Sequence, residues 1–570
     1  MESFVFLKSA TSNANNSVKV DNRRSANYQS SVWDYNFLRL LGTTYTCCDT
    51  MEEEHVRIAE KLKEEVKSLI MGSMGPLANL EFIDAVQRLG LKYQFETEIK
   101  EALFAIYKDS NEEWWANDLH ATALRFRLLR RNLLFVSQDV FERFKDKKTH
   151  DFSGELCEDV KGILSLYEAC FLGWDGERVL DKARIFTTTH LNAMNRSTVS
   201  DGGSLDKKVK HALELPLHWR APRVEARWFI DVYEQDPNMN LALLKLAKLD
   251  FNMVQSIHQK EVGELSRWWV RTGLDKLSFA RNGLMQNYMY CCAVTFEPQF
   301  AHVREALTKI GSVLTATDDL YDVYGSLEEL ELFTSFIDRW DIKEIDELPR
   351  DIRLIFLAMY NLSNEIGFDI LRDRDFNGVP YVAKMLGDVC SAYLKEARWY
   401  HGGYKPRMEE YLDNGLVSIG MLPLLAVAYM LTTDNLSKET VDHVAAAAPL
   451  VRYCSLLLRM IDDLGTSSDE LRRGDTLKSV ECYMNQAGAS EEIAREHIEE
   501  LVRNTWKKMN QCCFGDGQSS FADPFLSFTL NSVRGAHFFY QFGDGFGVTE
   551  SWTKDTVLSV LFQPIPLDED

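Results

Sequence analysis

Apolar residues recur at helical spacing along this chain from about residue 51 onward, and few residues interrupt the pattern. The chain has 13 prolines in 570 residues, roughly half the usual share of about 5%. Proline breaks helices, and alternating runs that would indicate strands are scarce. The pattern therefore predicts an all-α protein, and the lack of βαβ alternation argues against a dinucleotide-binding fold.

Two predicted helices show this spacing most clearly. Each carries a stripe of apolar residues that repeats every three or four positions, as expected for a buried helix face. The first stripe comprises Leu80, Phe82, Ile83, Val86 and Leu89, and the second comprises Ala306, Ile310, Val313, Leu314 and Thr317. The second stripe runs directly into an acidic cluster.

The length of the chain exceeds what one hydrophobic core usually supports, so we expect at least two domains. Polar breaks at residues 197–204 and 235–240 are the best candidates for linkers. We therefore expect two helical domains, at residues 23–230 and 231–570. A flexible segment, residues 1–22, would precede them.

Composition excludes several classes of protein. The net charge of −22 argues against nucleic-acid binding, which needs a basic surface. The longest apolar stretch, residues 421–431, is too short to cross a bilayer. The 11 cysteines include no C-x-x-C spacing, which fits neither a disulfide framework nor a zinc site and indicates a reducing compartment.

The N-terminal 22 residues are rich in Ser and Asn and contain few acids. This composition resembles an organelle transit peptide, although the segment is short and has no arginine before Arg23. A flexible tail is the alternative interpretation. We expect the plastid stroma as the location, with the cytosol as the alternative.

The first cluster with a chemical signature is residues 318–322, Asp-Asp-Leu-Tyr-Asp. On a helix, Asp318 and Asp322 share one face, while Asp319 is turned about 100° away. Two carboxylates at the end of an apolar stripe could hold Mg²⁺, which prefers oxygen ligands. A solvated helix face is the alternative, because about two such acidic patterns are expected by chance in a chain this acidic.

The second cluster lies between residues 459 and 470 and is more specific. Asp462, Thr466 and Glu470 are four residues apart, again on one helical face. Two carboxylates and a hydroxyl form a plausible second Mg²⁺ site, completed by water or phosphate oxygens. Arg459 lies one turn earlier, where a permanent positive charge suits a phosphate-bearing ligand.

Two such helices facing each other would hold a Mg²⁺ cluster able to bind a diphosphate and draw electrons from the bond behind it. The chain has no Walker-type loop, no G-x-S-x-G elbow and no H-E-x-x-H pair. The run at residues 543–547, Gly-Asp-Gly-Phe-Gly, is too loose a match to a phosphate loop to count.

These residues resemble a known family over nearly the whole chain. Residues 318–322 match the D-D-x-x-D motif of plant class I terpene synthases, and residues 462–470 match the second metal motif. Further matches are Arg23-Arg24-x8-Trp33, His211 to Arg220 and Ser266 to Trp269. The arginine pair with its spaced tryptophan resembles the subfamily dominated by flowering-plant monoterpene synthases.

The resemblance implies a catalytic C-terminal class I terpenoid synthase bundle and a helical, barrel-like N-terminal domain that is generally not catalytic. The implied cofactor is Mg²⁺, three ions, with Mn²⁺ as a possible substitute. The implied metal ligands are Asp318 and Asp322 on one wall and Asp462, Thr466 and Glu470 on the other. The implied substrate-binding residues are Arg281, Asp318, Asp322, Arg459, Asp462 and Lys478.

The resemblance also assigns a lid and two pocket aromatics. Arg23 and Arg24, with Trp33, would tie the N-terminal strand over the pocket. Trp269 and Tyr540 would stabilise carbocations by about 0.5–2 kcal/mol each through their ring faces. The alternative for any single aromatic residue is ordinary core packing.

The sequence departs from the family where Arg281-Asn282-Gly283 replaces the usual Arg-Asp-Arg. Asn-Gly favours a turn rather than a helix. Tyr290 and Gln286 stand where tryptophan and glutamate are common. With one arginine fewer near the leaving group, we expect weaker recapture of the diphosphate and more early-quenched, acyclic product.

We therefore predict a Mg²⁺-dependent lyase that converts geranyl diphosphate into a monoterpene or monoterpene alcohol, with acyclic products such as linalool favoured. A sesquiterpene synthase using farnesyl diphosphate, or an enzyme using both, is the first alternative. A chain-elongating prenyltransferase and a non-catalytic helical scaffold are more remote. The family implies a monomer, and no D-x-D-D sequence supports a protonation-initiated reaction.

Overall fold

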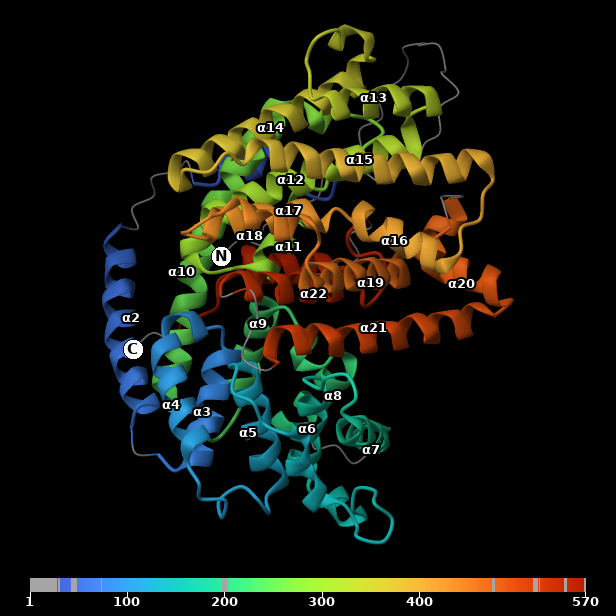
Figure 1. Cartoon of the computed structure of the whole chain (residues 1–570). Helices are drawn as coiled ribbons and strands as arrows, with labels where there is room; N and C mark the ends of the chain where they lie inside the picture. The colour runs from blue at the N-terminus through green and yellow to red at the C-terminus, as the bar shows by residue number, and fades with distance from the viewer. Residues whose placement is uncertain are drawn as a thin grey trace. The chain divides into compact units, whose positions relative to one another are not determined.

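The structure, a computed structural model, describes residues 28, 31–42, 49–72, 74–196, 203–473, 477–515, 521, 523–547 and 551–567. For residues 49–53, 468–473 and 551 it describes the backbone only. Within these ranges there is no β-strand (Figure 1). One isolated antiparallel bridge pairs Lys145 with Phe152. The all-α prediction is confirmed.

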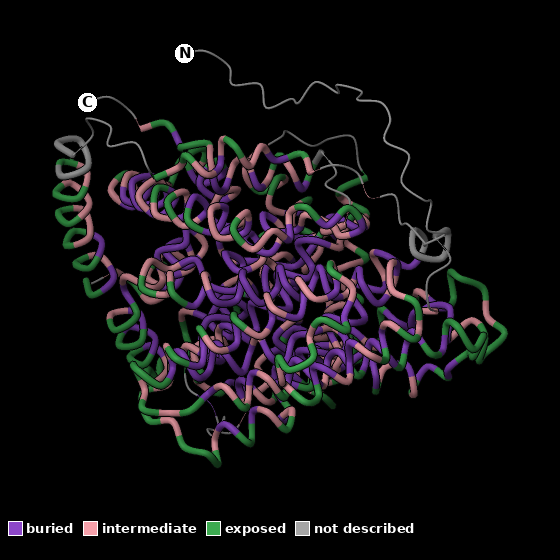
Figure 2. The backbone as a smooth tube through the Cα atoms, turned by 90° about the horizontal axis from the view of Figure 1, so that it is seen from above, coloured by how far each residue is buried: buried purple, intermediate pink, exposed green. Residues whose placement is uncertain are grey.

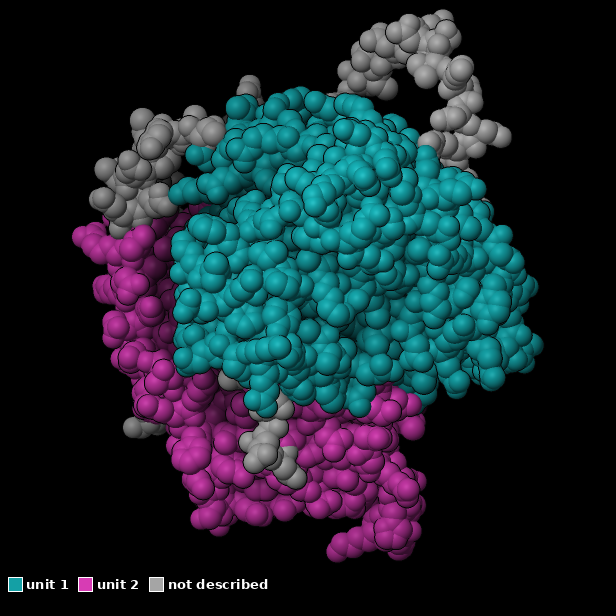
Figure 3. Space-filling view, turned by 45° about the horizontal axis from the view of Figure 1, so that its top comes forward, with its two compact units in different colours: residues 1–45, 257–502, 523–557 teal, residues 46–256, 503–522, 558–570 magenta. Residues whose placement is uncertain are grey.

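The chain divides into two compact units (Figure 3). Unit 1 comprises residues 1–45, 257–502 and 523–557, and unit 2 comprises residues 46–256, 503–522 and 558–570. Three helices contribute to both units: α10 (Leu241–Thr272), α21 (Glu491–Phe514) and α23 (Ser551–Leu561). The division between the two units falls inside α10, at residues 256/257. The domain boundary expected from the sequence, at residues 230/231, stays a prediction.

Apart from α2 and α7, the α-helices that lie wholly in unit 2 have 11 to 13 residues. α5 and α6 pack side by side, as do α6 and α7. Pro76 begins α3, where its missing N–H costs nothing. The unit contains α2 (Asp49–Ile70), α3 (Pro76–Arg88), η1 (Lys92–Gln94), α4 (Glu96–Lys108), α5 (Leu119–Arg131), η2 (Gln138–Phe144), η3 (Gly154–Glu158), α6 (Val160–Cys170), α7 (Arg178–Arg196), α8 (Ser204–Glu214), η4 (Leu217–Trp219) and α9 (Pro222–Tyr233).

Unit 1 contains the longer helices and the acidic clusters. Its members are α1 (Tyr35–Leu38), η5 (Leu274–Lys276), α11 (Leu284–Val294), η6 (Pro298–Phe300), α12 (Ala301–Asp319), η7 (Leu320–Tyr324), α13 (Leu327–Arg339), η8 (Ile345–Glu347), α14 (Arg350–Arg374), α15 (Val379–Gly402), α16 (Met408–Ser418), α17 (Met421–Thr432), α18 (Lys438–Ala445), α19 (Pro449–Arg473), α20 (Ser479–Ala487) and α22 (Phe525–Tyr540).

The core of unit 1 forms around α12, which packs against α11, α14 and α17. The predicted apolar stripe on α12 is buried throughout, from Ala306 to Thr317. α22 lies against both α11 and α19. This packing brings the C-terminal end of α12 and the middle of α19 to one region of the unit, although the two clusters are far apart in sequence.

Two stretches of the described chain, Met408–Thr432 and Lys438–Ser467, are long and apolar enough to cross a membrane by length and composition. In the structure, 72% and 61% of their apolar windows are buried, as in core helices. Figure 2 shows buried backbone running through the interior. Burial inside the protein accounts for their apolar character.

Candidate active site

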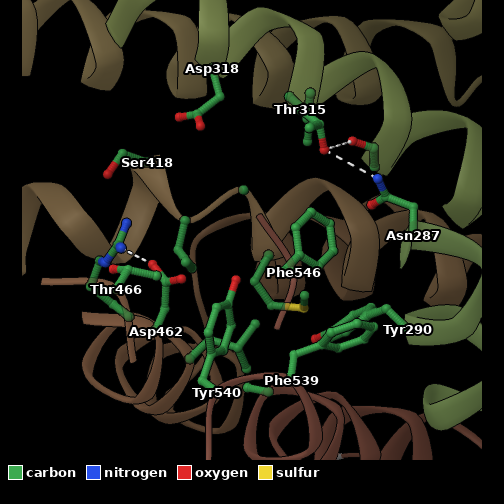
Figure 4. Close-up of a pocket in the computed structure, with 18 of the residues that line it drawn as sticks. Asn287, Tyr290, Thr315, Asp318, Ser418, Asp462, Thr466, Phe539, Tyr540 and Phe546 are labelled. Carbon is green, nitrogen blue, oxygen red and sulfur yellow. Dashed lines mark hydrogen bonds and ion pairs between the residues drawn. The ribbon is translucent and has the colours of Figure 1, made fainter. Parts of the chain in front are cut away.

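One cavity in unit 1 brings together most of the predicted site residues (Figure 4). It contains about 1020 Å³ of empty space, part of it open to solvent. The predicted residues that line it are Arg281, Asp318, Asp322, Arg459, Asp462, Thr466, Lys478 and Tyr540. These residues come from α12, η7, α19 and α22 and from the segments before α11 and α20.

The first acidic cluster lies where α12 ends and the π-helical turn η7 begins. Asp318 and Asp322 both line the cavity, whereas Asp319 is fully buried. The predicted separation of the three carboxylates onto two faces is therefore confirmed. The π-helical turn was not predicted; such turns are frequent at functional sites.

Arg281 pairs with the first cluster. Its backbone N–H donates to Asp319 Oδ2 at 2.6 Å, and its Nη2 donates to Asp318 Oδ2 at 2.7 Å. Nε of Arg281 lies 2.9 Å from Asp319 Oδ1. Burial raises the pKa of Asp319 to about 6, while Arg281 opposes that rise. Burial tends to lower the pKa of Arg281, but the neighbouring acidic groups, Asp319 foremost, together raise that pKa above its usual value.

The second cluster lies on α19. Arg459 contacts Asp462, and its Nε donates to Asp463 Oδ1 at 2.8 Å. Asp463 is fully buried and also accepts from Tyr411 Oη at 3.0 Å and from Ser479 N at 3.0 Å. Asp463 therefore holds Arg459 in position.

On the rest of the α19 wall, the structure describes the side chain of Thr466 but not that of Glu470. Thr466 lines the cavity one turn after Asp462, as predicted. The side chain of Glu470 lies outside the described residues, although its backbone continues α19. Lys478 is 5% exposed and lines the cavity directly before α20.

The aromatic predictions differ in outcome. Tyr540, at the end of α22, lines the cavity, and burial together with the nearby Asp462 carboxylate raises its pKa well above the usual value. Trp269 is 1% exposed on α10 and is not among the residues that line this cavity. Because Trp269 does not line the cavity, its role in stabilising cations stays a prediction.

Of the predicted lid, Arg23 and Arg24 lie outside the described residues. Trp33 is 8% exposed, and its backbone N–H donates to Ser31 Oγ at 3.2 Å. The same segment contributes a contact that the sequence did not reveal. The Arg281 guanidinium carbon lies 5.3 Å from the centre of the Tyr28 ring, and the Tyr28 hydroxyl bonds to Asp319.

Other residues line the cavity because of tertiary packing, which the sequence alone does not reveal. Asp544 and Phe546 line the cavity from the run at residues 543–547, whose sequence is too loose a match to a phosphate loop to have indicated this. In that run, Gly547 N–H donates to Asp544 Oδ1 at 2.6 Å. The sequence signal that could have indicated Asp544 is a carboxylate between two glycines shortly after the end of α22. Ser418, Tyr393 and Phe539 are further lining residues of this kind.

The donor set consists of hard oxygen ligands in two halves. Among the side chains that the structure describes, no three His, Cys, Asp or Glu groups converge closely enough to hold an ion alone. In Figure 4, Asp318 lies on one wall and Asp462 and Thr466 lie on another. Asp322 lines the same cavity. Carboxylate and hydroxyl oxygens suit Mg²⁺, which usually keeps waters and takes phosphate oxygens to complete its shell.

The fold and cavity define a helical enzyme with an oxygen-lined, metal-binding site. Two family models match the chain: "Terpene synthase, N-terminal domain" at residues 32–213 and "Terpene synthase family, metal binding domain" at residues 271–508. The chain belongs to the terpene synthase family. It is a carbon–oxygen lyase acting on a prenyl diphosphate, as its homologues are.

Curated relatives cover almost the whole chain. Beta-bisabolene synthase of Santalum austrocaledonicum is 60% identical over 96% of this chain and 94% of its own length. A (+)-alpha-terpineol synthase of Santalum album is 59% identical over the same shares. Santalene synthase of Santalum album is 56% identical over 96% of this chain and 95% of its own length.

Solved structures agree with the fold. Isoprene synthase of grey poplar (Populus x canescens), in complex with three Mg²⁺ ions and dimethylallyl-S-thiolodiphosphate, superposes with a TM-score of 0.85 at 41% identity, covering 94% of this chain and 99% of that chain. A limonene synthase with 2-fluorolinalyl diphosphate superposes with a TM-score of 0.90 at 39% identity, covering 95% of this chain and 100% of that chain.

Proposed function

We propose that this chain ionises geranyl diphosphate with the help of Mg²⁺ and releases a monoterpene or monoterpene alcohol. The observation that carries the proposal is the meeting of both acidic clusters at one cavity. Asp318 and Asp322 line it from α12 and η7, and Asp462 and Thr466 line it from α19. Three basic side chains line the same cavity, as a diphosphate site requires: Arg281, Arg459 and Lys478.

Asp318, Asp322, Asp462, Thr466 and Glu470 are the residues that would hold three Mg²⁺ ions, for which Mn²⁺ could substitute. Bound Mg²⁺ neutralises diphosphate charge and makes it a better leaving group. The three Mg²⁺ ions in the isoprene synthase complex support this count. Arg281 and Arg459 are already oriented by carboxylates, so little side-chain ordering would be needed when the diphosphate binds.

Once ionised, the substrate is a carbocation that water would quench. The cation must therefore be shielded from water. Four aromatic residues line one side of the cavity: Tyr290, Phe539, Tyr540 and Phe546 (Figure 4). Aromatic faces stabilise a cation without reacting with it, and their bulk excludes water.

Farnesyl diphosphate is the second candidate substrate, either alone or beside geranyl diphosphate. Relatives at similar identity are named after bisabolene and santalene, which have fifteen carbons, and after terpineol, which has ten. Purified protein should be incubated with each diphosphate separately, and the volatiles identified by gas chromatography–mass spectrometry. We expect ten-carbon products from geranyl diphosphate; turnover of farnesyl diphosphate alone would overturn the substrate proposal.

The same chromatogram tests the product class. Arg281-Asn282-Gly283 supplies one basic side chain where the family usually has two, which favours an early-quenched acyclic product. Ring-closed products are the second candidate, because the names of the relatives above denote cyclic compounds. A profile dominated by cyclic terpenes would remove the acyclic proposal and leave the terpene synthase assignment intact.

The proposal includes two further predictions. We propose a plastid location, with the cytosol as the alternative; fusing residues 1–45 to a fluorescent protein and imaging leaf cells tests it.

We also propose that the protein is a monomer, as the family implies. Light scattering coupled to size exclusion should give a mass near 65.6 kDa, and a mass twice as large would contradict it.

A further inference from the structure

Helix α16 carries none of the predicted site residues, yet it reaches Arg459 through a buried carboxylate. Nε and Nη2 of Arg459 each lie 2.8 Å from Asp463 Oδ1. Tyr411, on α16, donates its hydroxyl to the same oxygen at 3.0 Å. Tyr411 and Asp463 are both fully buried, and neither is among the residues that line the cavity. Any effect of the tyrosine on the cavity must therefore pass through the carboxylate.

The same face of α16 accommodates the aliphatic part of Arg459. Gly415 follows Tyr411 by one helical turn, which places both residues on one face of the helix. A Cβ atom on Gly415 would lie 2.9 Å from both Cγ and Cδ of Arg459. The glycine thus leaves room for the arginine stem, while the tyrosine fixes the carboxylate that binds the guanidinium.

Arg459 contacts two carboxylates, which differ in what else they would bind. Asp462 lines the cavity and is a proposed Mg²⁺ ligand, so a bound ion would compete with the arginine for its oxygens. Asp463 is 0% exposed and lies outside the lining of the cavity. We therefore expect Asp463 to be the partner that still holds Arg459 when the ion and the diphosphate are bound.

Asp463 also bonds to the segment that carries Lys478. Ser479 N–H donates to Asp463 Oδ2 at 3.0 Å, and Ser479 begins α20 directly after Lys478. Arg459 and Lys478 both line the cavity. One buried carboxylate therefore fixes two of the proposed diphosphate ligands, one by its guanidinium and the other by the adjoining backbone.

The first acidic cluster contains the same three kinds of group. Asp319 is fully buried and binds both the backbone N–H and Nε of Arg281. The Tyr28 hydroxyl bonds to the same carboxyl group. A tyrosine, a buried aspartate and an arginine that lines the cavity thus occur together on each wall.

We propose that Tyr411 is a positioning residue for diphosphate binding. Its hydroxyl holds the Asp463 carboxylate in the orientation that fixes Arg459 and the backbone beside Lys478. These two cations then meet the diphosphate without first having to be ordered, which lowers the entropic cost of binding. The inference rests on the proposed function, because it takes Arg459 and Lys478 as diphosphate ligands.

The test measures the Kd of inorganic pyrophosphate in the presence of Mg²⁺ by isothermal titration calorimetry. For Tyr411→Phe we expect this Kd to rise by about tenfold, the scale on which losing the partner that orients a ligating side chain weakens a site. The kcat/KM for geranyl diphosphate should fall by a similar factor. In Arg459→Lys, whose ammonium cannot make the paired contacts with Asp463, adding Tyr411→Phe should raise the Kd by a smaller factor.

The matched control is Tyr288→Phe, which removes a hydroxyl from the same kind of cluster. Tyr288 is fully buried and donates to Glu261 Oε2 at 2.8 Å, and Arg304 Nε donates to the same oxygen at 2.9 Å. Arg304 is fully buried and is not among the residues that line the cavity. Both tyrosine variants should lose stability, because each loses a buried hydrogen bond to a charged group. Tyr288→Phe should leave the Kd of pyrophosphate unchanged.

Gly415→Ala tests the same arginine from its aliphatic side and carries the test if Tyr411→Phe does not fold. The added methyl group would displace Cγ and Cδ of Arg459, so the Kd of pyrophosphate should rise. Gly387→Ala is its control, because the nearest atom to that added Cβ would be 3.6 Å away, and the Kd should not change. Far-UV circular dichroism shows whether each variant folds.

An unchanged Kd in Tyr411→Phe, an equal rise in Tyr288→Phe, or the same factor in the Arg459→Lys background would overturn the proposal. Turnover separates this failure from failure of the proposed function. If the unmodified chain binds pyrophosphate in a Tyr411-dependent way but turns over neither geranyl nor farnesyl diphosphate, the proposed function alone is overturned. Absence of pyrophosphate binding by the unmodified chain overturns both proposals.

Discussion

Arg281 and Asp318 form an ion pair with 2.7 Å between Nη2 and Oδ2. The residue predicted to bind the diphosphate is therefore paired with a residue predicted to bind Mg²⁺. Arg459 makes the same kind of contact with Asp462 on α19. Each wall of the cavity therefore carries a guanidinium already oriented by a carboxylate. Side chains that are ordered before the ligand arrives lose less entropy on binding and hold it more accurately.

Removing the guanidinium of Arg281 tests this arrangement. For Arg281→Ala we expect kcat/KM with geranyl diphosphate to fall by about 10²- to 10³-fold, as when one preorganised donor to a developing anion is lost. Arg281→Lys should recover only part of that loss, because the ammonium cannot bridge two groups in one plane. Arg271→Ala, an exposed arginine at the end of α10, is the control. Equal kinetics for Arg281→Ala and Arg271→Ala would contradict the assigned role.

The close approach of α19 and α22 gives a prediction about stability. A Cβ on Gly465 would lie 2.8 Å from Tyr540 Cβ and 3.1 Å from Tyr540 O. Gly465→Ala should therefore lower the free energy of unfolding by about 1–3 kcal/mol through overpacking and displace Tyr540 from the cavity.

The matched control for that variant is Gly387→Ala on α15, where the nearest atom to the added Cβ would be Ile337 Cγ2 at 3.6 Å. Alanine fits there, and a helical Gly→Ala change should stabilise by about 0.5–1 kcal/mol. Denaturant unfolding of the two variants should shift in opposite directions. Shifts of the same sign would show that helix packing at Gly465 is looser than the structure has it.

Restoring the usual family residues tests the product proposal. The Asn282→Asp/Gly283→Arg double variant returns the second arginine to the segment before α11. A Cβ at Gly283 would lie 3.3 Å from Thr315 Cγ2, so a small adjustment is needed. We expect the ratio of cyclic to acyclic product to rise severalfold. Gly283→Ala controls for the added Cβ, and an identical ratio in all three proteins would remove the arginine from the explanation.

Unit 2 offers a prediction about pH. Burial raises the pKa of Glu168 to about 7, while Arg127 opposes the rise; the usual value is 4.5. Between these pH values the folded carboxyl keeps its proton while the unfolded one releases it, so stability falls as pH rises from about 4.5 to 7. The loss reaches about 3 kcal/mol.

Glu168→Gln should abolish this loss of stability, because the glutamine amide does not titrate. Its oxygen can still accept the hydrogen bond that Leu217 N–H donates to Glu168 Oε2 at 2.8 Å. Denaturant unfolding at pH 5 and pH 8 measures it: the variant should gain stability relative to the unmodified chain at pH 8 but not at pH 5. The exposed Glu113→Gln serves as control. Parallel pH profiles for Glu168→Gln and the unmodified chain would show that Glu168 titrates normally.

The parts of the site that sequence could predict are those set by local geometry. Asp318 with Asp322, and Asp462 with Thr466, are four residues apart on helices, and that spacing alone places each pair on one face. The burial of α12 followed from its apolar stripe for the same reason. The turn at Gly283 was also predictable, because Asn-Gly disfavours a helix, and α11 begins only at Leu284.

What sequence could not reveal depends on contacts between distant segments. Arg281 reaches Asp319 across 38 residues, and Tyr28 reaches Arg281 from the N-terminal segment. Asp544 lines the cavity because of how the chain leaves α22. The division between the units falls inside a continuous helix, α10, where no polar break marks it. Such features follow from tertiary packing, which overrides local propensity.

The central claim is that the carboxylates of α12 and α19 act together on a prenyl diphosphate through Mg²⁺. Release of inorganic pyrophosphate from geranyl and farnesyl diphosphate, titrated with Mg²⁺ and reversed with EDTA, tests it most directly. Asp318→Asn and Glu470→Gln should each lower kcat/KM by about 10²-fold or more with unchanged far-UV circular dichroism, while the exposed Glu347→Gln keeps full activity. Pyrophosphate release that persists in EDTA, or in both site variants, would contradict the account.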